Sequence, residues 1–459
     1  MPGIAAAPKT PPIVKGPWPT GSLTLFAKDP IAFFMKYSPQ YEGIYEVTSI
    51  FFRVATDFKQ MMVITDPDYV KHILQDNNRN YRKSFSNEPL KLLLGKGLIT
   101  SEGDFWRKQR RLIQPAFHRE RLAAFAQIMT DECAALIKKW HTLPDKSVVN
   151  LSHDMSEMTL RIICKCMFTA DVDDAIELVN REINTANEKL VARVLNPMSI
   201  PLWVPTPANV REKHTYDAIR NVVSSVIDKR RKSNARHDDL MAMLMEARDE
   251  DTGEMMSDEQ IKDEVATIFL AGHETTAVSL TWLFHCLDEN PEAEAKLLQE
   301  AKTALNGRTP VIEDLKNLEY TRMVVEETMR LYPTVWSLGR QSYQDDVIDG
   351  WSVPEATNIF IPIYYIHRCE KYWPEPLKFI PERFNKENSK NRHKFAYFPF
   401  GGGPRLCIGN NFAMMEMQLM VPMIIQQFHL QKPQNYKFKI TPLITMRPDP
   451  EMQMEISGI

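Results

Sequence analysis

Apolar residues recur along most of the chain at the spacing that is typical of amphipathic helices. From Asp68 to about Leu331 this pattern predicts mainly helices joined by loops. The segment from about Ile261 to Glu289 is predicted to be one long helix that ends at Asn290-Pro291, because proline does not continue a helix. At 1.5 Å per residue this helix would be roughly 40 Å long, which is enough to cross a whole domain.

Strand-like patterns lie toward the two ends of the chain. Gly43 to Thr65 and Val347 to Arg368 contain short runs of aromatic and β-branched residues, and the end of the chain from Phe428 is similar. The pattern therefore predicts a mainly α protein with a smaller β region. Because we find no linker, we expect a single domain over residues 1–459, in which residues 1–25 form an extended, proline-rich entry segment.

Composition agrees with a globular protein that encloses a ligand. Hydrophobic residues make up 44% and charged residues 25% of the chain, so it can bury a large core and still hold a cofactor. The formal net charge of -3 gives no indication of nucleic-acid binding. The start lacks the apolar core of a signal peptide, and we find no continuous apolar run of about 18 residues. We therefore expect a cytoplasmic protein with no membrane anchor.

The six cysteines are scattered along the chain, which argues against a disulfide framework and for a reducing compartment. Cys164 and Cys166 form a C-x-C pair, which could indicate a metal or redox site. Their neighbours from Leu160 to Phe168 are mostly apolar, however, so we expect these two thiols to be buried as small apolar side chains.

The segment FPFGGGPRLCIG, from Phe398 to Gly409, is the most informative part of the sequence. Its consecutive glycines permit an irregular backbone that can approach a flat group closely. The run Asn410 to Gln426 is predicted to be a helix, so Cys407 would lie close to a helix N-terminus, a position that stabilises a thiolate. A buried structural cysteine in a glycine loop is the alternative interpretation.

The spacing of Phe400, Gly403, Arg405, Cys407 and Gly409 resembles the haem-binding signature F-x-x-G-x-R-x-C-x-G of the cytochrome P-450 family. The resemblance implies a haem b cofactor whose iron takes Cys407 as its axial ligand, and a thiolate in this position favours O–O cleavage. Phe400, Arg405 and Gly409 would bind the cofactor. It also implies the family's triangular fold, with the haem between the long helix and the helix after the cysteine loop.

The predicted long helix carries the sequence AGHETT from Ala271 to Thr276. A glycine inside a helix costs about 1 kcal/mol relative to alanine, so Gly272 indicates that something packs against the backbone. The simplest interpretation is a helix-packing patch followed by a solvated glutamate. The segment also resembles the family's oxygen-binding helix, which implies that Ala271 binds the cofactor and that Glu274 and Thr275 are catalytic and deliver protons to oxygen.

A second pattern predicts a supporting charge network. Glu327 and Arg330 are spaced to share one face of a predicted helix. Together with Arg383 they resemble the E-x-x-R and P-E-R-F elements of the same family. The resemblance implies a buried, structural network that fixes the cysteine loop, and an exposed ion pair is the alternative.

Several residues are candidates for binding the carboxylates of the haem. Trp106 and Arg110 lie one helical turn apart and resemble the family's W-x-x-x-R helix, which implies that both bind a propionate. Arg340 and Arg405 would be further propionate ligands. Arginine suits this role because its planar guanidinium group can bind both oxygens of a carboxylate.

The resemblance implies a monooxygenase that inserts one atom of O2 into a hydrophobic substrate. We expect a fatty acid first and a terpenoid or steroid second. A peroxide-using or isomerising enzyme, or a haem gas sensor, would be the alternative, but relatives of the former kind often lack the acid and alcohol of Glu274 and Thr275. The substrate pocket is expected to draw on five mostly apolar regions: Tyr81 to Leu98, Leu195 to Pro207, the long helix, Thr334 to Leu338, and Leu443-Ile444.

Electrons are expected to come from a separate ferredoxin or flavodoxin type donor with its reductase, because no group of cysteines in the chain could hold an iron–sulfur cluster. Arg107, Lys108 and Arg111 would lie on the outer face of the Trp106 helix, and the segment 392–394 could extend this basic surface. Such a surface would steer an acidic donor. A solvated basic helix without a partner is the alternative.

Overall fold

The computed structural model describes residues 7–18, 20–48, 60–168, 182, 185–186, 188–190, 192–193, 200–232 and 239–459. The chain forms two compact units, each assembled from three stretches of sequence. Unit 1 comprises Met1–Glu88, Val335–Lys378 and Lys390–Cys407; unit 2 comprises Pro89–Thr334, Phe379–Ser389 and Ile408–Ile459. Parts of two predicted segments, the strands at 43–65 and the pocket region at 195–207, lie outside the described residues.

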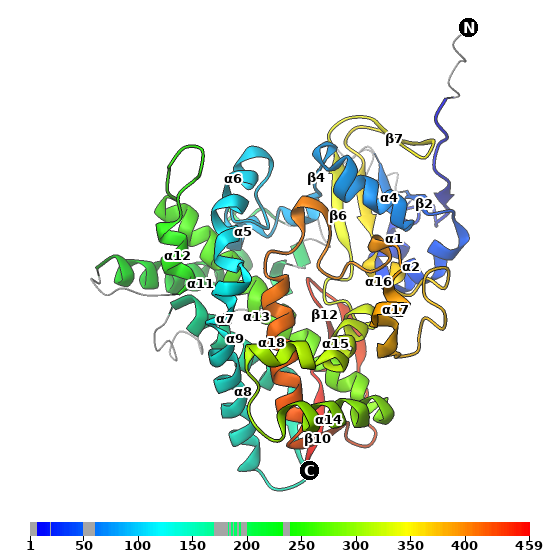
Figure 1. The fold of residues 1–459 in the computed structure, drawn as a ribbon. Coiled ribbons are helices and arrows are strands. Elements are labelled where there is room, and N and C mark those ends of the chain that lie inside the picture. Colours follow the sequence, from blue (N-terminus) through cyan, green and yellow to red (C-terminus); the bar gives the residue numbers. More distant parts are fainter. Residues whose placement is uncertain are drawn as a thin grey trace. The chain divides into compact units, whose positions relative to one another are not determined.

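Unit 1 combines short helices with a β-sheet (Figure 1). Its elements in the first stretch are β1 (Ile13–Val14), α1 (Leu23–Lys28), α2 (Pro30–Tyr37), η1 (Ser38–Gln40), β2 (Ile44–Val47), β3 (Met61–Ile64), α4 (Pro67–Lys71), η2 (His72–Asp76), η3 (Asn78–Asn80), β4 (Tyr81–Lys83) and η4 (Phe85–Asn87). Those in the later stretches are β6 (Leu338–Ser342), β7 (Asp346–Ile348), β8 (Trp351–Val353), β9 (Asn358–Ile361), α16 (Ile363–Ile366), η8 (Lys394–Ala396) and η9 (Gly403–Arg405).

The sheet of unit 1 joins strands from distant parts of the sequence. Its order is β1-β2-β3-β9-β6-β4, with parallel pairs at β1–β2 and β3–β9 and antiparallel pairs elsewhere. The strand-like pieces that were predicted between residues 347 and 368 are confirmed up to β9, and the last of them is wrong. Proline at position 362 removes the ladder N–H and ends β9, after which the residues of α16 form a helical turn.

Unit 2 is mainly helical and carries two small sheets. Its helices are α5 (Lys91–Leu94), α6 (Gly103–Ile113), η5 (Gln114–Phe117), α7 (Arg119–Ala123), α8 (Ala126–His141), α9 (Leu151–Phe168), α11 (Pro207–Lys232), α12 (Leu240–Glu246), α13 (Asp258–Asp288), α14 (Pro291–Leu305), η6 (Ile312–Asn317), α15 (Glu319–Leu331), η7 (Pro381–Phe384), α17 (Lys386–Ser389) and α18 (Asn410–Ile425). Its strands are β5 (Ser147–Asn150), β10 (Phe428–Gln431), β11 (Lys439–Pro442), β12 (Met446–Asp449) and β13 (Gln453–Gly458).

Helix α13 is the central element of unit 2, and the prediction of one long helix is confirmed. It begins after a capping box, in which the Ser257 hydroxyl accepts from the Gln260 N–H and the Gln260 side chain accepts from the Ser257 N–H. Asn290 and Pro291 follow its end and start α14. It packs against α9, α11, α15 and α18, which explains why its residues are buried on most sides. Among the described residues, no helix combines the length and apolarity needed to cross a membrane.

The last stretch of the chain completes the β structure of unit 2. Strand β13 pairs antiparallel with both β10 and β5, so the end of the chain is joined to a strand that lies far upstream. Strands β11 and β12 form a separate antiparallel hairpin. This hairpin brings its turn residues onto α13, which becomes important for the site.

Candidate active site

The cysteine loop lies in unit 1 and depends on glycine. Gly401 and Gly403 have φ values of +74° and +67°, which side-chain-bearing residues rarely adopt. A Cβ atom at Gly403 would lie 1.8 Å from the carbonyl oxygen of Leu74 in η2, so any larger residue would displace the loop. The Cys407 N–H donates to the Phe400 carbonyl at 3.0 Å, which closes the loop. The signature glycine therefore serves backbone packing.

A buried histidine holds the start of this loop. The Phe398 N–H donates to Nε2 of His367 at 3.0 Å, so the imidazole proton must lie on Nδ1. The His367 ring is fully buried and stacks on Tyr397 with a centroid distance of 5.2 Å. The indole N–H of Trp373 donates to the Ala396 carbonyl at 3.3 Å. Our sequence analysis missed His367, because its partner is 31 residues away along the chain.

Cys407 differs from the other cysteines in its exposure. It is exposed, whereas Cys133, Cys164 and Cys166 are buried. Burial raises the pKa of the Cys164 thiol to about 12 and raises the pKa of Cys166 well above its usual value, so both remain protonated thiols, as expected for apolar packing. The interpretation of Cys407 as a buried structural cysteine is contradicted. An exposed cysteine in a glycine loop suits a ligand that binds from outside the loop, such as a haem iron.

The helix expected after Cys407 is α18, and Gly409 is its N-cap residue. Phe400 and Gly409 are both half-buried. Arg405, in η9, is half-buried as well. Cys407 and Arg405 therefore lie in the same short loop, which is where the sequence predicts a thiolate and one propionate-binding arginine.

On α13 the two candidate catalytic side chains contact different partners. The Thr275 hydroxyl donates to the Ala271 carbonyl at 2.7 Å, one turn earlier on the helix. The Glu274 carboxylate instead accepts from the Thr445 hydroxyl at 2.6 Å. Its side chain is 12% exposed and lies 3.8 Å from the Arg447 guanidinium group. The interpretation of Glu274 as a solvated surface glutamate is therefore wrong.

Close helix packing explains Gly272. A Cβ atom at this position would lie 3.0 Å from Cδ1 of Ile163 on α9, so the glycine lets α9 and α13 approach. The neighbouring His273 is buried, and burial lowers the pKa of its imidazole. His273 is therefore a neutral core residue, with Nδ1 3.2 Å from the Phe269 carbonyl oxygen.

The predicted charge network forms within unit 2. Glu327 and Arg330 on α15 are both fully buried, and two N–H groups of Arg330 donate to the Glu327 carboxylate at 2.7 and 2.8 Å. The Glu327 carboxylate also accepts from the Ile380 N–H at 2.8 Å and lies 3.4 Å from Nε of Arg383. The alternative of an exposed ion pair is therefore wrong. The carboxylate ties α15 to the segment that contains η7.

The candidate propionate ligands are divided between the two units. Trp106 is buried and Arg110 half-buried on α6 of unit 2. Arg340 is half-buried on β6 of unit 1, and its guanidinium donates to the Gly339 carbonyl at 2.8 Å. Each unit therefore carries one part of the predicted haem-binding set.

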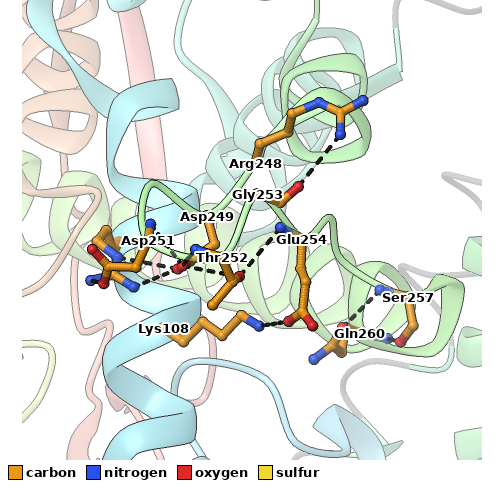
Figure 2. Close-up of polar contacts among 10 residues, drawn as sticks. Lys108, Arg248, Asp249, Asp251, Thr252, Gly253, Glu254, Ser257 and Gln260 are labelled. Carbon is orange, nitrogen blue, oxygen red and sulfur yellow. Dashed lines mark hydrogen bonds and ion pairs between the residues drawn. The ribbon is translucent and has the colours of Figure 1, made fainter.

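The basic surface that we expected on α6 is largely neutralised, which corrects the prediction of a docking surface there. Lys108 binds Glu254, and Arg111 binds Asp249 at 2.5 Å and Asp251 at 2.6 Å. The three acidic residues come from the turn between α12 and α13, which is shown with Lys108 in Figure 2. The Arg111 guanidinium lowers the pKa of Asp249 to about 2, so the ion pair persists across the physiological pH range.

A buried acid that our sequence analysis missed lies on α18. Glu416 is 1% exposed, and burial raises the pKa of its carboxyl group well above the usual range. Thr276 of α13 lies beside it. A single acidic residue in the apolar run of the predicted helix was the signal that could have identified it.

Glu416→Gln is expected to stabilise the protein more at pH 8 than at pH 5. The raised pKa lets the folded carboxyl keep its proton to a higher pH than the unfolded group, which ionises above about 4.5. Below pH 4.5 the protonated Glu416 makes its full contribution to the free energy of unfolding. As the pH rises from 4.5 toward the pKa of the folded protein, this contribution falls by up to about 1.4 kcal/mol per pH unit. Glutamine titrates in neither state. Thermal unfolding from pH 5 to 8 measures the difference, with the exposed Glu387→Gln as the control. A pH-independent difference would contradict a protonated Glu416.

Comparisons with known proteins agree with this geometry. The cytochrome P450 family matches residues 11–455. The cyclooctat-9-en-7-ol 5-monooxygenase of Streptomyces melanosporofaciens is 34% identical over 366 residues, which cover 80% of this chain and 79% of that protein. LUTEIN DEFICIENT 5 of Arabidopsis thaliana is 32% identical over 425 residues, covering 87% and 70%. The crystal structure of the cytochrome P450DA heme domain superimposes with a TM-score of 0.88 at 25% identity and covers 99% of both chains.

The chain therefore belongs to the cytochrome P450 family. Its cofactor is haem b, and it is a monooxygenase that uses O2, a substrate and a redox partner.

Proposed function

We propose that this monooxygenase hydroxylates a hydrophobic substrate and that the Cys407 thiolate would hold the haem iron. The observation that carries the proposal is the exposed Cys407 in a glycine loop that His367 anchors. When bound, the haem supplies the activation of O2, and its thiolate ligand favours O–O cleavage. Trp106, Arg110, Arg340 and Arg405 would bind the propionates, since arginine can donate to both oxygens of a carboxylate. Phe400, Ala271 and Gly409 would hold the haem as well.

In this proposal Glu274 and Thr275 hold and move protons. They are neighbours on α13, and the Thr275 hydroxyl bonds to a carbonyl of its own helix, which keeps its oxygen in a fixed position. The Glu274 carboxyl gives its proton to the Thr275 oxygen, which passes its own proton onward, and solvent reprotonates Glu274. General acid–base groups of this kind typically contribute about 10²–10⁴-fold.

Thr275→Ala tests this assignment. The variant is expected to keep its haem and to release more hydrogen peroxide per NADPH consumed, because protons no longer reach oxygen in time. Thr275→Ser, which keeps the hydroxyl, is the control. Unchanged coupling of NADPH to product in Thr275→Ala would refute the role. Higher turnover with added hydrogen peroxide than with NADPH and a donor would favour the peroxide-using alternative.

The substrate class remains a proposal with two candidates. A fatty acid is the first expectation from the sequence, and a terpenoid or steroid is the second. The name of the Streptomyces relative specifies a cyclic alcohol, which favours the second candidate. Titration with long-chain fatty acids and with polycyclic terpenoid alcohols, followed by the haem spin-state change, separates them. A spin-state change with only one class would identify it.

We also propose an acidic ferredoxin or flavodoxin type donor that binds near the cysteine loop in unit 1. Lys394 in η8 is exposed there, and the Arg392 guanidinium lies 4.4 Å from the centroid of the Trp373 ring. Lys394→Glu is expected to slow electron transfer about tenfold at low salt and by much less at high salt, because the steering is screened. Lys108→Met, at a residue already paired with Glu254, is the control. A rate insensitive to salt and to Lys394→Glu would place the donor elsewhere.

Two further proposals concern the number of domains and the cellular compartment. Because both units need segments from distant parts of the sequence, we propose that the whole chain works as a single domain. Because Cys133 and Cys164 are buried as thiols, we propose a reducing compartment, the cytoplasm.

A further inference from the structure

The candidate acid on α13 is held by a turn from the end of the chain. Thr445 donates its hydroxyl proton to Oε1 of Glu274 at 2.6 Å, and Nη2 of Arg447 lies 3.8 Å from the same oxygen. Both contacts come from the β11–β12 hairpin and both use one carboxylate oxygen. Neither residue belongs to a motif that the sequence analysis identified.

The hairpin turn is fixed in place by its own contacts. The Met446 N–H donates to the Thr334 carbonyl at 2.9 Å, and the Trp282 indole N–H donates to the Met446 carbonyl at 2.8 Å. Trp282 lies on α13 itself, and Met446 is fully buried. The residues that contact Glu274 therefore flank a peptide that is anchored to the same helix.

The charged and polar groups around the Glu274 carboxylate favour one position for this group. Nε and Nη2 of Arg447 are buried and make no hydrogen bond within the described part of the chain, so the Glu274 carboxylate is the opposite charge that faces this guanidinium. The adjacent imidazole of His273 is held neutral by burial, since burial lowers its pKa. Thr445 is 2% exposed, so water competes little for its hydroxyl.

We propose that Thr445 and Arg447 are positioning residues that hold Oε1 of Glu274 and thereby fix the orientation of its carboxyl group for proton transfer to Thr275. The proposal rests on the proposed function of Glu274 as the proton donor to Thr275. Oε1 accepts a hydrogen bond from the Thr445 hydroxyl and faces Arg447, so the two contacts together restrict the carboxyl group to one rotamer. Without the two contacts the carboxyl samples other rotamers, and proton delivery slows.

The test compares substitutions in two backgrounds. Thr445→Val and Arg447→Met are expected to lower product per NADPH about tenfold and to increase the solvent deuterium isotope effect on product formation. Thr445→Ser and Arg447→Lys, which keep the hydroxyl and the charge, are expected to restore most of the loss. In a Glu274→Gln background Thr445→Val and Arg447→Met should change product per NADPH by less than about twofold, since double-mutant cycles isolate the shared contact.

Thermal unfolding of the haem-loaded proteins supplies a readout independent of turnover. Arg447→Met should lower the melting temperature more in the wild-type background than in the Glu274→Gln background. In the wild type the substitution leaves the Glu274 carboxylate without its cation, whereas glutamine carries no charge. Equal losses of product per NADPH in both backgrounds would overturn the proposal and assign the hairpin a general structural role. If Glu274→Gln alone leaves coupling unchanged, the proposed function of Glu274 fails instead, so the two failures are distinguishable.

Discussion

Replacing Cys407 with alanine is expected to abolish product formation and to remove the absorption band of the reduced, CO-bound protein that is characteristic of thiolate-ligated haem. The reason is that, in the proposed role, the exposed Cys407 supplies the thiolate that binds the iron. The thiolate controls how the iron activates O2, so its loss removes the chemistry of the cofactor.

The control for this substitution is Cys369→Ala, which removes a half-buried cysteine of the same unit. It is expected to keep both the band and the turnover. Spectra of the CO complex and haem content measured on the same samples separate loss of the ligand from loss of the haem. A Cys407→Ala protein that kept the thiolate band would contradict the ligand assignment.

Glu327→Ala is expected to destabilise the protein by about 3–5 kcal/mol, because removing one partner of a buried ion pair leaves the other charge uncompensated. Arg330 would remain fully buried without its carboxylate, and the Ile380 N–H would lose its acceptor. The expected result is a large drop in the midpoint of urea unfolding, together with weaker haem retention.

The neighbouring Glu326 on the same helix offers a matched control. It pairs with Arg322, and both side chains are partly exposed, at 21% and 33%. Ion pairs of this exposure contribute about 1 kcal/mol or less, so Glu326→Ala should change the unfolding midpoint little. Similar losses for Glu326→Ala and Glu327→Ala would mean that burial does not determine the strength of the network.

Local sequence patterns correctly predicted the structural features that depend on residues close together along the chain. Helix α13 follows from its apolar spacing and its terminal proline, and the pairing of Glu327 with Arg330 follows from their spacing on one helix face. The sequence motif predicted a glycine requirement at position 403, but it could not show which contact excludes a larger side chain. The atom that it accommodates, the carbonyl of Leu74, belongs to a distant segment.

Contacts between distant segments explain what the sequence could not predict. Lys108 was expected on an open basic surface, but its partner Glu254 lies 146 residues away. Thr445 reaches Glu274 over a separation of 171 residues. The spacing of residues along the chain carries no information about which distant side chains will meet. The ion pairs that neutralise Lys108 and the surroundings of the candidate acid Glu274 are therefore visible only in the fold.

The division of each unit into three stretches has a consequence for biosynthesis. Unit 1 needs residues up to Cys407, and unit 2 needs β13 near the end of the chain, where it pairs with the early strand β5. During translation unit 1 cannot be completed before Cys407 has emerged from the ribosome, and unit 2 cannot be completed before β13 has emerged, although domains usually fold as units as they are synthesised. Unit 2 therefore stays incomplete until the residues of β13 have been synthesised, which lengthens the time during which its early helices expose apolar surface.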